Sequence, residues 1–404
     1  MDLDAFRQLL TPRGQEALRA AAETPGSDPV AAVTRLRKSF DAGLTSAALT
    51  QATLRRRARE KFGADADLMY FTPDGLEQAT RREVADHRAR RIAPGSRVAD
   101  VCCGIGGDLL ALARAGCTVE AVDADPLTAE VARANAEALG FGDRVSVRTA
   151  DAATIDPAAF DVLFADPARR TSRGRTFDPM AYSPAWPEVL DMVGRAEAAC
   201  LKVAPGIPYP FIPAGAEAEW VSYRGDVKEA VIWTGTLAGE TAGETTDAAT
   251  GETAGGAGRR ATMLPSGVTM AAGPVELRAG AGPVCRYLYE PDGAAIRAHL
   301  VAEVAALVGG HLLDPNIAYI TSEAPAETPW ASRYEVHEVL PFSLKRLRAA
   351  LRERDAGNVT VKKRGSAIDI ERLRKDLRLS GNASATVVLT RIGEKPFALV
   401  CSPI

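Results

Sequence analysis

The chain has 404 residues, of which 46% are hydrophobic and 25% are charged. This length and composition indicate a soluble, globular protein with two or three domains, each large enough to bury its own core. No segment approaches the roughly 20 apolar residues of a membrane span, and the N-terminal residues lack the basic and apolar regions of a signal peptide. We therefore expect a cytoplasmic protein with no membrane partner.

The cysteines and histidines show no pattern typical of a metal site. The six cysteines include no C-x-x-C pair, and the four histidines are isolated in the sequence. The sequence therefore supports neither a disulfide framework nor a bound metal, and we expect reduced thiols. It does not specify an oligomeric state.

Charge is distributed unevenly along the chain, although the net charge is only −3. Residues 1–99 contain 17 Lys and Arg against 13 Asp and Glu, and residues 342–404 contain 14 against 6. Two basic ends therefore flank an acidic centre, which includes a low-complexity tract at about 238–258. That tract is too polar to pack, and we expect a disordered insertion there.

Residues 1–90 form the first predicted region, in which apolar residues recur at helical spacing. Within it, residues 55–61 form a basic cluster, which is either a solvated helix face or a phosphate-contacting surface. At the end of this region, Thr72 or Asp74 can cap a helix that begins near Gly75.

Residues 98–108 have the pattern of an apolar strand, a glycine turn and the start of a helix. Gly104 and Gly106 let a ligand lie against backbone N–H groups at the helix N-terminus. A dinucleotide fingerprint fails here, because Leu109 occupies its third glycine position. Asp100, just before the turn, would repel a pyrophosphate but can attract the cationic amino group of S-adenosylmethionine.

This turn resembles the first motif of class I S-adenosylmethionine-dependent methyltransferases, D-x-x-x-G-x-G, which stands here at residues 100–106. The resemblance implies a Rossmann-like sheet and cofactor contacts by Asp100, Cys102, Gly104 and Gly106. Methyltransferases of exocyclic amines often carry an F-T-P segment ahead of this motif, at the methionine end of the cofactor. Phe71 and Thr72 resemble that segment and are predicted cofactor contacts, with helix capping as the alternative.

Residues 91–275 alternate strand and helix patterns, which predicts a doubly wound parallel α/β sheet with helices on both faces. Ligands of such sheets bind beyond the carboxyl ends of the strands. Asp123 ends the second strand, where a carboxylate can accept hydrogen bonds from ribose hydroxyls. Asp151 follows the third strand and either accepts from the adenine amino group or caps a turn. Segments 227–235 and 259–264 are expected to form an antiparallel hairpin that closes the sheet.

After the fourth strand, Asp166 and Pro167 match the start of the [DN]-P-P-[FYW] motif of methyltransferases that act on amino groups of bases. In that motif the acidic or amide side chain and backbone carbonyls accept hydrogen bonds from the target amine. The aromatic residue is absent, and a basic loop follows instead. We predict that the loop contacts substrate phosphates through Arg169, Arg170 and Arg173. Lys202, at the end of strand five, either lies beside a buried carboxylate or orients the substrate.

Residues 285–404 are predicted to form a small, basic α/β domain. Residues 294–308 have a helical pattern, and residues 314–330 are proline-broken and irregular. The remainder is predicted in the order helix, strand, helix, strand, strand, over residues 342–354, 358–364, 370–379, 385–391 and 395–401.

Two further resemblances bear on the substrate. The core is similar to RNA cap guanine-N2 methyltransferases of the trimethylguanosine synthase type, whose motifs match residues 100–108 and 122–126, although Asp108 replaces their Asn. Residues 285–404 resemble the THUMP-like C-terminal domain found on bacterial methyltransferases. THUMP domains proper bind tRNA ends, so this resemblance implies an RNA partner, tRNA or rRNA.

These observations predict an enzyme that uses S-adenosylmethionine to methylate an exocyclic amine, guanine N2 or adenine N6, of a base in structured RNA. Two alternatives are a non-catalytic protein that binds the cofactor and RNA, and a methyltransferase of proteins or small molecules. A cytosine-C5 mechanism is not supported, because alanine rather than cysteine follows Pro167.

Overall fold

The computed structural model divides the chain into two compact units. The first unit contains residues 1–217 and 229–239, and the second contains residues 218–228 and 240–404. The structure describes residues 1–24, 28–168, 170–171, 174–175, 178–239, 243–247, 253–256 and 258–404. Within these ranges, no helix combines the length and apolar character needed to cross a bilayer.

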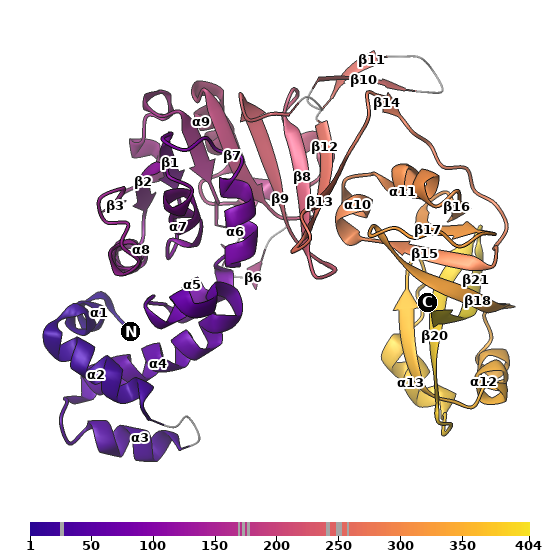
Figure 1. Cartoon of the computed structure of the whole chain (residues 1–404), viewed down its shortest axis with the longest axis horizontal. Coiled ribbons are helices and arrows are strands. Elements are labelled where there is room, and N and C mark those ends of the chain that lie inside the picture. The colour runs from indigo at the N-terminus through magenta and orange to yellow at the C-terminus, as the bar shows by residue number, and fades with distance from the viewer. Residues whose placement is uncertain are drawn as a thin grey trace. The chain divides into compact units, whose positions relative to one another are not determined.

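Helices occupy the chain before the first strand, as the pattern of residues 1–90 predicts (Figure 1). They are α1 (Leu3–Leu10), α2 (Pro12–Ala22), α3 (Pro29–Leu36), α4 (Ala42–Phe62), α5 (Pro73–Gln78) and α6 (Arg82–Ala89). Polar side chains at the N-termini of α1 to α5 accept hydrogen bonds from backbone N–H groups that would otherwise lack partners. The Thr72 hydroxyl accepts from the N–H of Gly75 at 2.9 Å, so the predicted capping role is confirmed.

The first unit contains a sheet with the strand order β9-β7-β4-β1-β2-β3. The neighbouring pairs from β7 to β3 are parallel, and β9 pairs antiparallel with β7. The order reverses at β1, which creates the switch point where ligands of such sheets bind. The strands are β1 (Arg97–Val101), β2 (Thr118–Asp123), β3 (Val145–Thr149), β4 (Val162–Ala165), β7 (Ala198–Val203) and β9 (Asp226–Gly235). The helices between them are α7 (Gly107–Arg114), α8 (Pro126–Ala138) and α9 (Trp186–Arg195).

The N-terminal helices and this sheet share one hydrophobic core. Buried apolar side chains of α1, α4, α7, α8 and the strands form a single cluster, which includes Phe6, Leu44, Phe71, Ile105, Leu109, Val131 and Val231. Helix α1 also contacts α8 (Figure 1). The helical region is therefore packed as part of the first unit.

The predicted closing hairpin is wrong. Residues 259–264 lie in β12 (Gly258–Leu264), which pairs antiparallel with β13 (Val268–Ala271) and is not a neighbour of β9 in the strand order. A strand that the sequence did not predict, β8 (Glu217–Tyr223), belongs to the sheet. Its residues are all buried, and the buried carboxylates of Glu217 and Glu219 interrupt the apolar pattern expected of such a strand.

The acidic tract also differs from the expectation of disorder. Strand β10 (Gly243–Asp247) pairs antiparallel with β11 (Thr253–Gly256) and parallel with β14 (Val275–Glu276). Backbone hydrogen bonds form these ladders. The other residues of the tract from 240 to 257 lie outside the described ranges.

The second unit contains a seven-stranded sheet with the order β16-β17-β15-β18-β21-β20-β19. Helices α12 and α13 pack on it through buried leucines, as the regular spacing of residues 342–404 predicts. The strands are β15 (Tyr287–Pro291), β16 (His311–Asp314), β17 (Ile317–Ser322), β18 (Ala331–Pro341), β19 (Ala356–Lys363), β20 (Ala383–Ile392) and β21 (Lys395–Pro403). The helices are α10 (Gly293–Arg297), α11 (Val301–Leu307), α12 (Leu344–Glu353) and α13 (Ile370–Leu377).

Two predictions for this unit are wrong. The segment expected to be irregular contains β17, because its prolines, Pro315, Pro325 and Pro329, all lie outside that strand. The helix predicted over residues 294–308 is split into α10 and α11, because His299 adopts a left-handed backbone conformation with φ 55°.

Candidate cofactor and active site

A cavity of about 820 Å³ lies at the carboxyl ends of β1, β2, β4 and β7 in the first unit. One part of its wall consists of residues that follow these strands: Cys102, Gly104, Asp108, Asp123, Asp166, Pro167 and Lys202. Another part consists of α5 and its flanks, including Thr72, Gly75, Glu77 and Thr80. The two groups are called here the strand-end wall and the helical wall.

The glycine turn after β1 approaches the cavity through unusual backbone conformations. Cys102, Gly104 and Gly106 have φ angles of 82°, 55° and 89°, a region in which residues with a Cβ atom are strained. The N–H of Cys102 donates to the carbonyl of Val122 at 3.0 Å, which ties the turn to β2. A Cβ atom at Gly104 would meet nothing within 4 Å, so this position opens onto free space.

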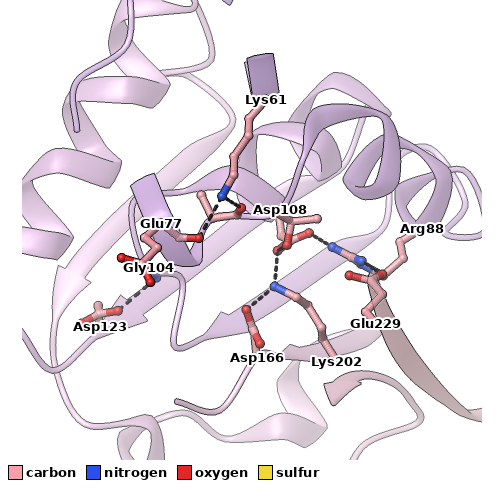
Figure 2. A network of polar contacts seen from close by, with 11 residues as sticks. Lys61, Glu77, Arg88, Gly104, Asp108, Asp123, Asp166, Lys202 and Glu229 are labelled. Carbon is pink, nitrogen blue, oxygen red and sulfur yellow. Dashed lines mark hydrogen bonds and ion pairs between the residues drawn. The ribbon is translucent and has the colours of Figure 1, made fainter. Parts of the chain in front are cut away.

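Asp123 ends β2 and holds the same turn. Its Oδ2 accepts from the N–H of Gly104 at 3.0 Å (Figure 2). Its Oδ1 accepts from the N–H of Asp125 at 2.9 Å. A carboxylate oxygen has two lone pairs, so both oxygens keep acceptor capacity for the hydroxyls of a ribose.

Asp100 is completely buried at the end of β1 and is not among the residues that line the cavity, and neither of its carboxylate oxygens has a hydrogen-bond partner among the described residues. Burial raises the pKa of Asp100 well above its usual range, and the negative charges of Asp108 and Asp166 raise it further. A buried carboxyl without partners is costly. The cationic amino group of S-adenosylmethionine would supply the missing donors, so the residues present fit this cofactor.

Asp166 and Lys202 form the centre of a buried ion-pair network (Figure 2). The ammonium of Lys202 is 5% exposed and lies between Asp166, to which it donates, and Asp108, whose Oδ2 is 3.6 Å away. The backbone of Ala168 exchanges two hydrogen bonds with Ser183, which fixes the chain after Pro167. The structure therefore confirms that Lys202 lies beside carboxylates.

The network continues away from the cavity through Arg88 of α6. Arg88 is 2% exposed and bridges Asp108 and Glu229 of β9 (Figure 2). Burial alone would raise the pKa of Asp108, but Arg88 and Lys202 outweigh that effect and hold it below its ordinary value. The pKa values of Asp108 and Asp100 thus shift in opposite directions despite similar burial, because Asp108 forms ion pairs with Arg88 and Lys202, whereas the charge of Lys202 only partly offsets the burial of Asp100.

Other predicted site residues lie outside the cavity wall. Phe71 is buried, packs against Phe62 with ring centroids 5.6 Å apart, and does not line the cavity. Asp151 is exposed and caps a short 3-10 helix by accepting from the N–H of Ala153 at 2.8 Å. Arg169 and Arg173 are outside the described residues. Arg170 lies in β5 (Arg170–Thr171), which pairs with β6 (Gly174–Arg175).

The basic cluster at residues 55–61 is largely engaged in contacts within the protein. Arg55 donates to the carbonyl of Met69 at 2.8 Å, and Arg59 pairs with Asp67 at 3.0 Å. Lys61 donates to three backbone carbonyls at the end of α5, described below. These contacts give much of the cluster a structural role.

The cysteines of the turn are poorly suited to nucleophilic chemistry. Burial is the main cause that raises the pKa of both Cys102 and Cys103, and nearby Asp100 and Asp123 add to it. A thiolate is therefore disfavoured beside the cavity. In the part of the chain that the structure describes, no group of three or more histidine, cysteine and acidic residues is arranged to hold a metal ion.

Sequence reasoning missed the partners that organise the site. Arg88, Glu229 and Asn135 are isolated polar residues in helix or strand patterns, and only the fold brings each of them to its partner: Arg88 pairs with Glu229, and Asn135 donates to the carbonyl of Ile105. Asp108 was visible as a substitution within the glycine motif, and its charge was the available signal for a cationic partner.

Comparisons with known proteins agree with this geometry. A methyltransferase domain model matches residues 98–172, a THUMP domain-like model matches residues 331–403, and a domain of unknown function, DUF8688, matches residues 2–58. The chain is 37% identical over 364 residues to S-adenosylmethionine-dependent methyltransferases of Mycobacterium tuberculosis strains CDC 1551 and H37Rv, covering 87% of this chain and 95% of each relative.

The fold is also shared with a solved structure. A Porphyromonas gingivalis W83 protein assigned as a methyltransferase superposes with a TM-score of 0.75 at 20% identity, over 96% of this chain and 98% of that one. The identity to the M. tuberculosis relatives shows that the chain belongs to the S-adenosylmethionine-dependent methyltransferases. Its C-terminal part carries the THUMP-like domain of this group.

Proposed function

We propose that the protein methylates an exocyclic amine of a base in structured RNA. The proposal rests mainly on Asp166 and Pro167, which lie on the wall of the cavity directly after β4. These residues match the start of the motif with which methyltransferases hold amino groups of bases. The THUMP-like domain and the basic C-terminal region support RNA as the carrier of that base.

The cofactor would be held by the strand-end wall together with Asp100, which is buried at the end of β1. Asp100 would accept the amino group of the methionine part, the glycine turn would lie against it, and Asp123 would accept the ribose hydroxyls. The contact of Asp151 with adenine is also part of the proposal. When bound, the cofactor supplies a methyl group on a sulfonium, which is already a good leaving group.

The contribution of the protein is then mainly positional. The free lone pairs of Asp166 and the carbonyl of Pro167 would accept hydrogen bonds from the target amine and direct the nitrogen lone pair towards the methyl group. Lys202 holds Asp166 in one orientation from a buried position. The adjacent loop, with Arg169, Arg170 and Arg173, would contact substrate phosphates.

The experiment that tests the proposal combines the purified protein, radiolabelled S-adenosylmethionine and total RNA from a strain that lacks the gene. Digestion to nucleosides should yield one labelled base modified at an exocyclic nitrogen. Label in protein or small molecules instead, with the RNA unlabelled, would contradict the proposal and favour the alternative substrate classes. Cofactor binding without any labelled product would favour a non-catalytic role.

A matched control keeps this assay specific. Asp143 is an exposed aspartate in the loop before β3, and it lies outside the cavity wall. The variant Asp143→Ala should therefore label the same nucleoside at the same rate as the natural protein.

Binding to RNA should also weaken steeply with added salt if arginines neutralise phosphates.

A further inference from the structure

The helical wall of the cavity consists of α5 and the residues on either side of it. Thr72, Gly75, Glu77 and Thr80 of this segment line the cavity. Helix α5 has only six residues, too few for an isolated helix to be stable in water. Its position must therefore be set by contacts with the rest of the protein.

Lys61, at the end of α4, holds the C-terminal end of α5 (Figure 2). Its ammonium donates to the backbone carbonyls of Leu76, Glu77 and Ala79 at 2.7, 2.8 and 2.9 Å. An ammonium has three N–H donors, and the last turn of a helix leaves carbonyls without partners inside the helix. All three donors of Lys61 are thus used on the helical wall.

Gln51, in the middle of α4, holds the chain just before α5. Its side chain is completely buried, its Nε2 donates to the carbonyl of Phe71 at 2.6 Å, and its Oε1 accepts from the N–H of Phe71 at 3.0 Å. This paired contact resembles one rung of a sheet and fixes the entry to the helical wall. Phe62 of the same helix packs on the Phe71 ring.

The helical wall is in turn joined to the glycine turn. Asn135 of α8 accepts from the N–H of Tyr70 at 2.6 Å, and its Nδ2 donates to the carbonyl of Ile105 at 2.8 Å. A Cβ atom at Gly75 would lie 2.4 Å from Cγ2 of Ile105, so α5 lies directly against the turn. A displacement of α5 would therefore displace the backbone on which the cofactor is expected to lie.

We infer that Gln51 and Lys61 are positioning residues for cofactor binding, and that the N-terminal helical region matched by a domain of unknown function serves as part of the cofactor site. Residues 2–58 contain Gln51, and Lys61 follows on the same helix. This inference rests on the assignment of the cavity to S-adenosylmethionine. The test below therefore includes a variant that examines that assignment separately.

The test measures the affinity of the full chain for S-adenosylhomocysteine by calorimetry. Gln51→Leu and Lys61→Met remove the hydrogen bonds while nearly preserving side-chain size. Each should weaken binding by about tenfold, which corresponds to about 1.4 kcal/mol. Hydrogen exchange of the amides of residues 73–80 should become faster. Arg57→Met, an exposed residue on the same helix, is the matched control and should bind like the natural protein.

Rescue distinguishes positioning from general stability. Lys61→Arg keeps a cation that can donate to the α5 carbonyls, so it should recover most of the affinity lost in Lys61→Met. The melting midpoint without ligand should be similar in these two variants, because Lys61 is only partly buried, at the end of α4. Loss of affinity that only follows a lower melting midpoint would assign Lys61 a structural role and overturn the inference.

The variant Asp123→Ala distinguishes failure of the positioning inference from failure of the assignment of the cavity to the cofactor. If Asp123→Ala weakens binding while Gln51→Leu and Lys61→Met bind like the natural protein, the cavity assignment holds and the positioning inference is wrong. If Asp123→Ala binds normally as well, the cavity is not the cofactor site, and both the inference and the proposed site fail.

Discussion

The two walls of the cavity differ in what holds them together. The strand-end wall is built from ion pairs, with Lys202 between Asp108 and Asp166 and Arg88 behind them. The helical wall is held by hydrogen bonds to backbone carbonyls and N–H groups, made by Gln51 and Lys61. The charges expected to act on the substrate therefore lie on the strand-end wall, whereas the shape of the cavity depends on the helical wall.

The largest expected effect concerns the ion-pair network of the strand-end wall. Arg88→Met leaves the buried carboxylate of Glu229 without its cation and leaves Asp108 with Lys202 alone, which should lower the free energy of unfolding by about 3–5 kcal/mol. Urea unfolding monitored by circular dichroism measures this loss. An exposed pair is the control: Arg97→Met, which breaks the contact with Glu120, should cost at most about 1 kcal/mol. Equal losses of unfolding free energy in both variants would show that the buried ion pairs stabilise the protein no more than an exposed ion pair does.

The second prediction separates chemistry from binding on the same wall. Asp166→Ala should reduce methyl transfer by about 100-fold or more, because the target amine loses the acceptor that orients it. Affinity for S-adenosylhomocysteine should change little, since Asp166 is not expected to contact the cofactor. Single-turnover labelling and calorimetry on the same preparation provide both values. Turnover at the natural rate in this variant would reject the proposed role.

The third prediction uses the unpartnered carboxyl of Asp100. Because its pKa is raised in the folded state, the folded protein keeps a proton that the unfolded chain releases near pH 4, and stability should fall as the pH rises above that value. Asp100→Asn removes this cost, so the cofactor-free variant should unfold at higher urea concentration than the natural protein at pH 8. It should also bind S-adenosylmethionine about tenfold more weakly, because the charge-assisted contact is lost.

Calorimetry in buffers of different ionisation enthalpy sharpens this prediction. The cation of the cofactor should draw a proton off Asp100, so binding should release protons in the natural protein and fewer in Asp100→Asn. Identical proton release in the two proteins would mean that another group titrates on binding.

The smallest expected effect belongs to the helical wall. Burial, followed by the charges of Arg81 and Lys202, lowers the pKa of Lys61 to about 8, while Glu60 and Glu77 oppose this shift. Between about pH 8 and 10 the unfolded chain therefore binds more protons at this residue than the folded protein, and stability should rise with pH over that window. Lys61→Met should lack this rise in a series of urea unfolding curves. A rise of equal slope in both proteins would show that other groups cause it.

Much of the fold could be predicted from the sequence, because local patterns determined it. The five parallel strands and the glycine turn were found from apolar runs that end in glycine or aspartate. Strand β8 was missed because its buried glutamates resemble surface residues, and their burial depends on partners distant in sequence, such as Arg91 for Glu217 and Thr262 for Glu219. The split between α10 and α11 depends on one left-handed residue, His299, whose conformation no periodicity indicates.

The site could be predicted only where it follows a strand. Asp100, Asp123 and Asp166 were found because parallel strands end at one edge, and the cavity lies there. The helical wall was only partly anticipated, since Lys61 had been grouped with a basic cluster and Gln51 had no pattern around it. Side chains that bind backbone atoms of a distant segment leave no motif, because the backbone is the same in every sequence.

The close approach of Gly75 to Ile105 constrains how the helical region and the methyltransferase sheet can evolve. A helical region and a catalytic domain that share a wall cannot be exchanged as independent modules. A recombined gene that joined a foreign helical region to residue 63 would lose Gln51 and Lys61 together, and with them the support of α5. The two regions should therefore be inherited as one piece, and substitutions at positions 75 and 105 should be found in compensating pairs among relatives.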